Sequence, residues 1–279
     1  MRHAMWHVAF SVFQGGDSMM NETLKQSILD RLADQPGKIG FYYKNLATGE
    51  ELSYQEKMPM MAASVIKLFI MAEAYRQIHE GQLSKDQLVT IHKADCVPSC
   101  GALTYMHEGL QVTVEDLYTL MIILSDNSAT NFLIDIVGED NVNQFITELR
   151  YTTTRLNRKM FDAEKSARGI QNYITAREVG DLLEKMYMGQ LVSPEASADM
   201  IRVMKDQRLN SKIPFIIHTI PGRAPIAHKT GEDSGITHDA GIIFTKEPFI
   251  LVFCGNETDV APYERLMAEI SLELYQANA

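Results

Sequence analysis

Apolar and polar residues alternate near both ends of the chain, with a period that is typical of β-strands. Residues 38–44 and 51–54 form two such runs, separated by the turn-like segment 47–50, which indicates a hairpin. Three more strands are expected between about residues 225 and 256, followed by a helix over residues 263–275. The pattern predicts an α/β (α+β) fold with a mixed, mainly antiparallel sheet built from both chain termini.

The middle of the chain, from about residue 64 to residue 210, carries apolar residues mostly at helical spacing. We therefore expect helices flanking the sheet and an inserted all-helical lobe over residues 63–211. Residues 23–62 and 212–279 would form the sheet-containing lobe, and residues 1–22 an N-terminal extension. Together the two lobes would make one domain with its cleft between them.

A serine and a lysine stand three positions apart at the start of the first long helical run, as Ser64-Val65-Ile66-Lys67. Residues at this spacing share one face of a helix, so the amine of Lys67 can lie beside the hydroxyl of Ser64. Apolar neighbours such as Phe69 and Met71 would desolvate the lysine and lower its pKa, which suits it to accept the serine proton. Ser64 is a candidate nucleophile; a helix start with a surface lysine is the alternative for this motif alone.

The tripeptide Ser125-Asp126-Asn127 interrupts two apolar runs, residues 112–124 and 128–134. Three polar residues between such runs either satisfy one another in a buried turn or face a pocket. A capped turn between two helices and a polar site are therefore both open interpretations of this segment.

A second lysine occurs in Lys229-Thr230-Gly231, just before the strand-like runs 236–244 and 249–254. Glycine at a strand edge permits close approach of another backbone or of a ligand. The lysine and threonine offer a charge and a hydroxyl to a carboxylate, and a strand end entering a loop is the alternative.

The three motifs in this order resemble the signature of class A β-lactamases and penicillin-binding proteins, which is Ser-x-x-Lys, Ser-Asp-Asn and Lys-Thr-Gly. Residues 115–133, 154–158 and 227–231 are also similar to the family's helix pair, omega loop and active-site strand. The resemblance covers nearly everything after about residue 36, and it implies a β-lactamase-like fold.

The resemblance implies catalytic roles for three residues. Ser64 would be the acylated nucleophile, Lys67 its general base or proton relay, and Ser125 the donor of a proton to the leaving nitrogen. Acyl transfer through a serine ester requires this set of groups.

Five further residues would bind the substrate by the same resemblance. Asn127 would contact the side-chain amide, and Lys229 and Thr230 the carboxylate. The backbone N–H groups of the nucleophile and of Glu232, just past Gly231, would form the oxyanion hole.

The sequence departs from the family where a glutamate normally activates the deacylating water. That glutamate follows the segment matching residues 155–158 by two positions, and here the slot holds Met160, which cannot accept a proton. Asp162 and Glu164 are the nearest carboxylates; either would serve if the loop is wound differently, and structural or solvated roles are the alternative. We expect ready acylation and slow hydrolysis of the ester.

Two other family features are also replaced. The aspartate that pairs with the omega-loop arginine is matched by Asn172, so Arg158 would lack its ion pair. No arginine occurs in the strand 249–254, where many members place one for the substrate carboxylate. Candidate substitutes, each also interpretable as a surface or packing residue, are Arg223, His228 and His238.

Composition limits the partners and the compartment. The net charge of −10 over 279 residues, without a basic stripe, argues against nucleic acid, and no apolar run is long enough for a membrane span. The stretch 1–13 includes His7 and lacks a typical cleavage site after it, so we expect a cytoplasmic location, with a secreted or cell-envelope location as the alternative. A start at Met19 or Met20 would equally explain the extension.

The three cysteines favour the same compartment. Cys96 and Cys100 are expected as two loop thiols; a disulfide between them, or a metal site with His92, is the alternative. Cys254 lies in an apolar strand and is expected in the core.

The expected function is that of a β-lactamase-like serine hydrolase, acting on a small molecule such as a β-lactam or a peptidoglycan-like fragment, with no metal or organic cofactor. A D-Ala-D-Ala-type carboxypeptidase or a small esterase would tolerate the loss of the glutamate. A β-lactam sensor that is acylated without turnover is the alternative of another class.

Overall fold

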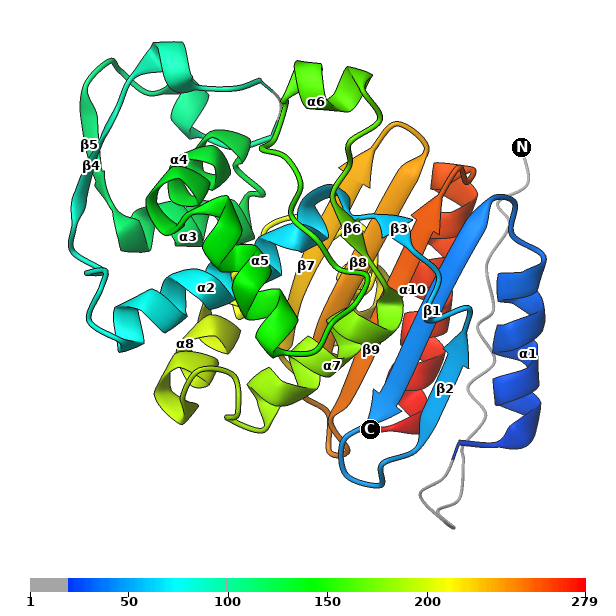
Figure 1. The fold of residues 1–279 in the computed structure, drawn as a ribbon. Helices are drawn as coiled ribbons and strands as arrows, with labels where there is room; N and C mark the ends of the chain where they lie inside the picture. The colour runs from blue at the N-terminus through cyan, green and yellow to red at the C-terminus, as the bar shows by residue number, and fades with distance from the viewer. Residues whose placement is uncertain (1–19, 99) are drawn as a thin grey trace, which may run out of the picture.

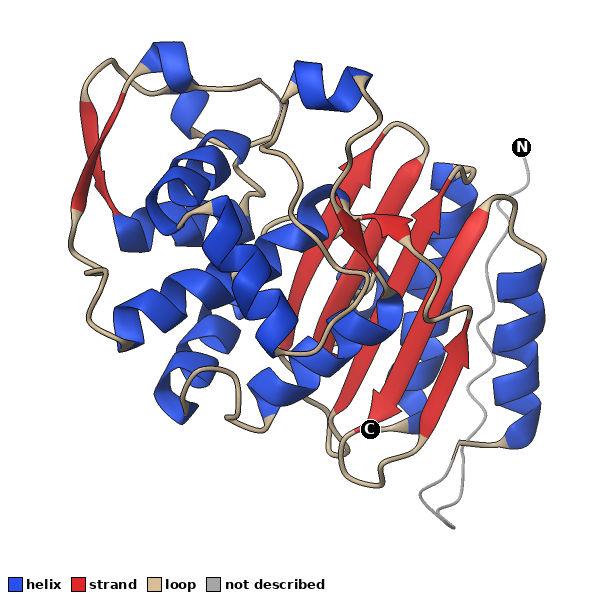
Figure 2. Ribbon diagram, viewed as in Figure 1, coloured by secondary structure: helices blue, strands red, loops and turns tan. Residues whose placement is uncertain are grey.

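A five-stranded antiparallel sheet forms the centre of the computed structural model, which describes residues 20–98 and 100–279 (Figures 1 and 2). The strand order is β2-β1-β9-β8-β7, so both ends of the chain contribute to one sheet, as the pattern predicted. Expectations for the extension before Met20 fall on residues 1–19, outside the described part. The strands are β1 (Lys38–Asn45), β2 (Glu51–Tyr54), β7 (Ile226–Asp233), β8 (Ile236–Ile243) and β9 (Phe249–Asn256).

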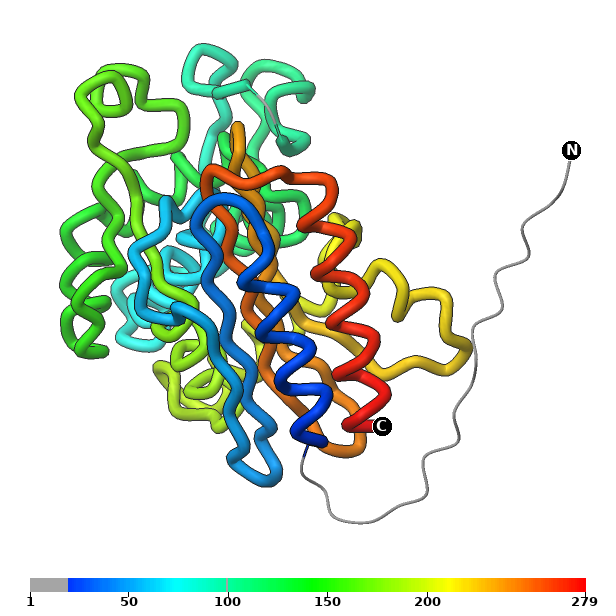
Figure 3. Tube along the Cα trace, turned by 90° about the vertical axis from the view of Figure 1, so that its right-hand side faces the viewer, coloured from blue at the N-terminus to red at the C-terminus, as the bar shows by residue number. Residues whose placement is uncertain are grey.

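The sheet is covered on both faces, and the alternation of side chains along its strands produces two cores. In β1, Phe41 and Tyr43 pack in the core beneath helices α1 and α10, whereas Tyr42 packs in the core shared with the helical lobe. Helices α1 (Glu22–Ala33) and α10 (Val260–Ala277) lie side by side on the outer face (Figure 3). Every residue of β8 and β9 is buried, because both strands are central in the sheet.

The residues between β2 and β7 are mostly helical, as expected, and most of these helices lie on the other face of the sheet (Figure 1). The short helix at residues 214–217 instead packs against α10, in the core of the outer face. Each of α3, α4 and α8 is capped at its start by a side chain that accepts a hydrogen bond from a backbone N–H of the first turn; the capping residues are Thr113, Asp126 and Ser193. The helices of this part are α2 (Lys67–His79), α3 (Val114–Ile123), α4 (Asn127–Val137), α5 (Glu139–Glu148), α6 (Ala163–Ala167), α7 (Ala176–Tyr187), α8 (Pro194–Lys205) and α9 (Pro214–Ile217).

Two short ribbons interrupt the helical part, and hydrophobic periodicity did not reveal them. Strands β3 (Met60–Met61) and β6 (Tyr173–Ile174) pair with each other, as do β4 (Leu88–Ile91) and β5 (Leu110–Thr113). These strands have only two to four residues, too few to show a period of two, and their partners are distant in sequence.

The nucleophile candidate lies one turn before the α-helix that the sequence predicted to contain it. Ser64 belongs to the 3₁₀ turn η1 (Ala63–Ile66), and α2 begins only at Lys67. Ala63 adopts a positive φ of 41°, a conformation that costs energy for a residue with a Cβ. This strained backbone conformation immediately precedes Ser64 at the start of the turn.

Candidate active site

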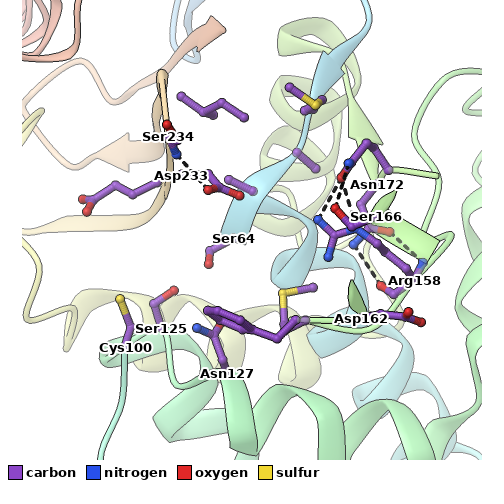
Figure 4. A pocket seen from close by; sticks show the side chains of 18 of the residues that line it. Ser64, Cys100, Ser125, Asn127, Arg158, Asp162, Ser166, Asn172, Asp233 and Ser234 are labelled. Carbon is purple, nitrogen blue, oxygen red and sulfur yellow. Dashed lines mark hydrogen bonds between the residues drawn. The ribbon is translucent and has the colours of Figure 1, made fainter. Parts of the chain in front are cut away.

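Three segments that are far apart in the sequence meet around one cleft of about 620 Å³. They are the turn η1, the connection between α3 and α4, and the strand β7 with its following turn. Of the residues expected to act in chemistry or binding, those that line the cleft are Ser64, Ser125, Asn127, Thr230 and Glu232. Figure 4 shows Ser64 between Ser125 and Asn127 on one side and Asp233 and Ser234 on another.

Lys67 is buried beneath this cleft, and its contacts differ from the simplest expectation. Its Nζ donates to the carbonyl of Ser125 at 2.7 Å, to Oδ1 of Asn127 at 2.8 Å and to Oγ of Ser125 at 3.1 Å. Among the described residues, no hydrogen bond joins it to Ser64. Burial, together with the charge of Lys229, holds the pKa of Lys67 well below its usual value. A lowered pKa increases the fraction of the amine that is unprotonated near neutral pH, and only this form can accept a proton.

Ser125 connects the two lysines of the site. Its Oγ accepts from Nζ of Lys67 at 3.1 Å and from Nζ of Lys229 at 3.0 Å, and its φ is +54°. A hydroxyl whose lone pairs are both occupied still has its own proton to donate. That proton is available to an acceptor in the cleft, which Ser125 lines.

Lys229 is fully buried on β7, and it also donates to the carbonyl of Thr230 at 2.8 Å. Burial lowers the pKa of Lys229 to about 7; nearby Asp239 opposes this shift and the charge of Lys212 adds to it. The lysine is therefore balanced between a cation and a neutral amine near neutral pH.

The titration of Lys229 predicts how stability depends on pH. The unfolded chain keeps this amine protonated up to the ordinary pKa of 10.5, whereas the folded protein releases the proton near pH 7. The unfolded state thus binds more protons between these values, so the free energy of unfolding should rise as pH increases from about 7 toward about 10.5. Urea unfolding at several pH values measures this slope. K229M should flatten it, whereas K246M, at an exposed lysine, should leave it unchanged.

Asp126, the middle residue of its motif, has a structural function. One carboxylate oxygen caps α4 by accepting from Ala129 N at 2.9 Å, and the other accepts from Ala102 N at 2.6 Å and Leu103 N at 2.9 Å. Gly101 packs directly on it, since a Cβ there would lie 2.2 Å from Cγ of Asp126. The capped-turn and polar-site interpretations of the segment therefore both hold, for different residues of the motif.

Gly231 allows β7 to approach the turn that carries Ser64. A Cβ on Gly231 would lie 3.1 Å from Cγ2 of Val65 and 3.3 Å from the backbone nitrogen of Ser64. A Cβ at this position would therefore be in a tighter contact than most Cβ atoms make, and its neighbours would have to shift by a few tenths of an ångström. The predicted need for glycine at this strand edge thus has a steric basis.

Lys212 is a residue that the sequence analysis missed. It is fully buried, pairs with Glu232 and lies 3.4 Å from a carboxylate oxygen of Glu264. The pair with Glu232 anchors the end of β7 beside the cleft. The local sequence, a single lysine two residues before a proline, does not predict that the side chain is buried in ion pairs, because these pairs depend on the fold.

Met160, for which the sequence resemblance predicted the position of a glutamate, lies at the cleft. Its side chain is 9% exposed and lines the cleft. The amide of Asn131 fixes its backbone, donating to the carbonyl at 2.9 Å and accepting from the N–H at 2.8 Å. The position of residue 160 is therefore held by contacts that do not involve its own side chain.

The two nearby carboxylates are engaged elsewhere. Asp162 lines the cleft, but it caps α6 by accepting from Lys165 N at 2.9 Å. Glu164 is 86% exposed and lies 3.8 Å from Arg168. The structural interpretation fits Asp162 and the solvated one fits Glu164.

Arg158 contacts only neutral groups among the described residues. Its Nε and Nη2 donate to Oε1 of Gln171 at 3.1 and 2.8 Å, and its Nη1 donates to the carbonyl of Lys159 at 3.1 Å. Asn172 binds the backbone on either side of it, accepting from Arg158 N at 3.0 Å and donating to its carbonyl at 3.0 Å.

The three candidate substitutes for the missing arginine do not line the cleft. Arg223 is exposed, His228 is buried against Asp239 at 2.8 Å, and His238 is buried between strands. His238 donates from Nε2 to the carbonyl of Met61 at 2.8 Å, and burial lowers its pKa to about 4, so it is a neutral packing residue.

The three cysteines differ in their burial and their location. Cys254 is buried in the core, as expected, and Cys96 is half-buried. Cys100 lies at the cleft, close to Ser125 (Figure 4). His92 contacts Glu108 at 2.7 Å and thus lies in an exposed ion pair.

The fold is that of the β-lactamases and the structurally similar PBP-A. The family model described as the β-lactamase enzyme family matches residues 23–278, and the chain belongs to this family. No helix in the described ranges is both long enough and apolar enough to span a membrane.

Individual relatives agree with this assignment. A β-lactamase of Rhodobacter capsulatus is 27% identical over 187 residues, a match that spans 66% of this chain and 63% of that relative's length. The crystal structure of a β-lactamase from Sphaerobacter thermophilus is 27% identical with a TM-score of 0.84, covering 93% of this chain and 98% of that one. A PBP-A mutant in an acyl-enzyme complex with penicillin G is 26% identical with a TM-score of 0.81, covering 91% and 96%.

Proposed function

We propose that this protein is a β-lactamase-like serine hydrolase that forms an acyl-enzyme on Ser64 and releases it slowly. The observation that carries the proposal is the Oγ of Ser125, which is hydrogen-bonded to two buried lysines at the cleft that Ser64 lines. This arrangement supplies a proton acceptor, a proton relay and a cation next to one nucleophile.

Acylation would follow from these positions. Oγ of Ser64 bonds to the carbonyl carbon of the substrate amide and gives its proton to Nζ of Lys67. The carbon–nitrogen bond breaks, and the leaving nitrogen takes the proton of Ser125, which Lys67 replaces. The backbone N–H groups of Ser64 and Glu232 bind the oxyanion in between.

Substrate binding would use the remaining groups. Lys229 and Thr230 attract the carboxylate of the substrate. Because Oδ1 of Asn127 already accepts from Lys67, its Nδ2 is left to donate to the carbonyl of the substrate side chain.

Deacylation would be slow because Met160 offers no proton acceptor where a water must be activated. A positioned general base contributes typically about 10²–10⁴-fold to such a step. We therefore expect hydrolysis of the ester to be much slower than its formation.

Mass spectrometry of the intact protein with benzylpenicillin tests the proposal. We expect a rapid mass increase equal to one penicillin, which then decays slowly. S64A should show none, because it lacks the hydroxyl that carries the ester. Rapid steady-state turnover would contradict slow release, and the absence of any adduct would contradict β-lactam acylation.

The absence of a proton acceptor at Met160 is also compatible with a carboxypeptidase or a small esterase, and a β-lactam sensor is the alternative of another class; the time course, together with substrate assays, separates the three. A carboxypeptidase of the D-Ala-D-Ala type, or a β-lactam sensor, would keep the adduct for many hours, and the carboxypeptidase would in addition cleave a D-Ala-D-Ala peptide. A small esterase would hydrolyse a phenyl ester without forming a penicillin adduct.

A further inference from the structure

One wall of the cleft carries a cation without an anionic partner. This loop wall consists of Arg158, Ser166, Gln171 and Asn172, all of which line the cleft. In Figure 4 it lies across from Asp233 and Ser234, with Ser64 between the two sides. Among the described residues, no carboxylate pairs with Arg158, whose contacts are Gln171 and a backbone carbonyl.

The guanidinium of Arg158 keeps donors for a ligand. It has five N–H groups, and three of them are used, by Nε, Nη1 and Nη2 once each. One N–H therefore remains on each terminal nitrogen, and a carboxylate oxygen can accept from such charged donors. Ser166 adds a hydroxyl, whose Oγ accepts only a long contact of 3.4 Å from Gln171.

The acidic residues that line the cleft do not neutralise this wall. Glu232 pairs with buried Lys212 on the β7 side. Asp233 accepts from Ser234 N at 2.7 Å at the β7–β8 turn, across the cleft from Arg158 (Figure 4). Asp162 has its carboxylate on the N-terminus of α6. The positive charge thus remains available at the loop wall.

We propose that the loop wall is a subsite for a second carboxylate, carried on the acyl side chain of the substrate. The proposal rests on the proposed function, which fixes the reacting carbonyl at Ser64 and the first carboxylate at Thr230. A substrate held in this way extends its other end past Ser64, toward Arg158. The subsite therefore selects acyl donors with an anionic side chain over neutral ones.

Two penicillins that differ by one carboxylate test the subsite. Benzylpenicillin and carbenicillin share the phenyl side chain, and carbenicillin has a carboxylate beside the amide carbonyl. We expect the second-order rate constant of Ser64 acylation to be about tenfold higher with carbenicillin, which corresponds to about 1.4 kcal/mol, close to the lower end of the contribution of one hydrogen bond to a charged group.

Gln171 offers a substitution that removes the free charge without removing the arginine. In Q171E the new carboxylate pairs with Arg158, so the loop keeps its contact while the ratio of carbenicillin to benzylpenicillin should fall to about one or below. R158Q should lower the ratio in the same way. R168Q loses a positive charge at the C-cap of α6, which does not line the cleft, and should keep the ratio of the wild type. Melting temperatures show that each variant is folded.

The outcomes are distinct. Equal ratios in wild type, Q171E and R158Q overturn the subsite, and so does a ratio that R168Q lowers as much as Q171E does. If neither penicillin forms an adduct, the proposed function fails, and the subsite is judged by equilibrium binding. Calorimetry then measures the affinity of S64A, and of the double variant S64A/Q171E, for each penicillin. Equal affinity of S64A for the two penicillins overturns the subsite.

Discussion

M160E is expected to shorten the lifetime of the penicillin acyl-enzyme by about 10²–10⁴-fold, the usual contribution of a positioned general base. Met160 lines the cleft, and its backbone is held on both sides by Asn131. Because these contacts go to backbone atoms, a glutamate at this position inherits the same placement. Its carboxylate would then reach the water that attacks the ester.

The matched control is M160Q, which has the size of glutamate but cannot accept a proton from water. Pulse labelling with benzylpenicillin, followed by mass spectrometry of the intact protein, gives the adduct half-life for each variant. Equal half-lives in M160E and M160Q would show that residue 160 does not face the deacylating water.

K67M is expected to slow the acylation of Ser64 by about 10²–10⁴-fold, because it removes the group proposed to accept the serine proton. Methionine is similar in length and fills the buried space, although it leaves the carbonyl of Ser125 and Oδ1 of Asn127 without a donor. Stopped-flow acylation with a chromogenic cephalosporin measures the rate.

The pH profile separates a base from a mere structural cation. In the wild type, acylation should increase with pH as Lys67 loses its proton, and because its pKa is lowered this increase should occur below the range of an ordinary lysine. K67R retains a charge in the same place, but arginine does not release its proton. A rate in K67R close to that of the wild type would contradict the role of a base.

The amino-acid sequence alone determined the strands of the sheet and the identity of the chemical groups in the candidate site. The hairpin of β1 and β2, the strands β7 to β9 and the capped start of α3 follow from local patterns of two to four residues, which reflect backbone geometry and turn chemistry. The motifs supplied a serine, two lysines and a second serine, and the resemblance to the family predicted that Met160 stands where a glutamate is usual.

The contacts of the site depended on the tertiary structure. The amine of Lys67 binds Ser125 and Asn127, about sixty residues away, although its spacing from Ser64 suggested that hydroxyl as its partner. Only the packing of η1 against β7 revealed why Gly231 is needed. Such contacts arise between elements that are far apart in the chain, so no local pattern contains them.

Tertiary structure also decided which charges are free. From sequence, His228 and His238 were candidates for the substrate carboxylate, and the fold buries both of them away from the cleft. Lys212 appeared unremarkable and is buried in ion pairs, whereas Arg158 lines the cleft and has only neutral partners in the part of the chain that the structure describes. Residue type fixes the charge that a side chain carries, but its exposure and its partners depend on how distant segments pack together, and these decide whether that charge binds a substrate or holds the fold.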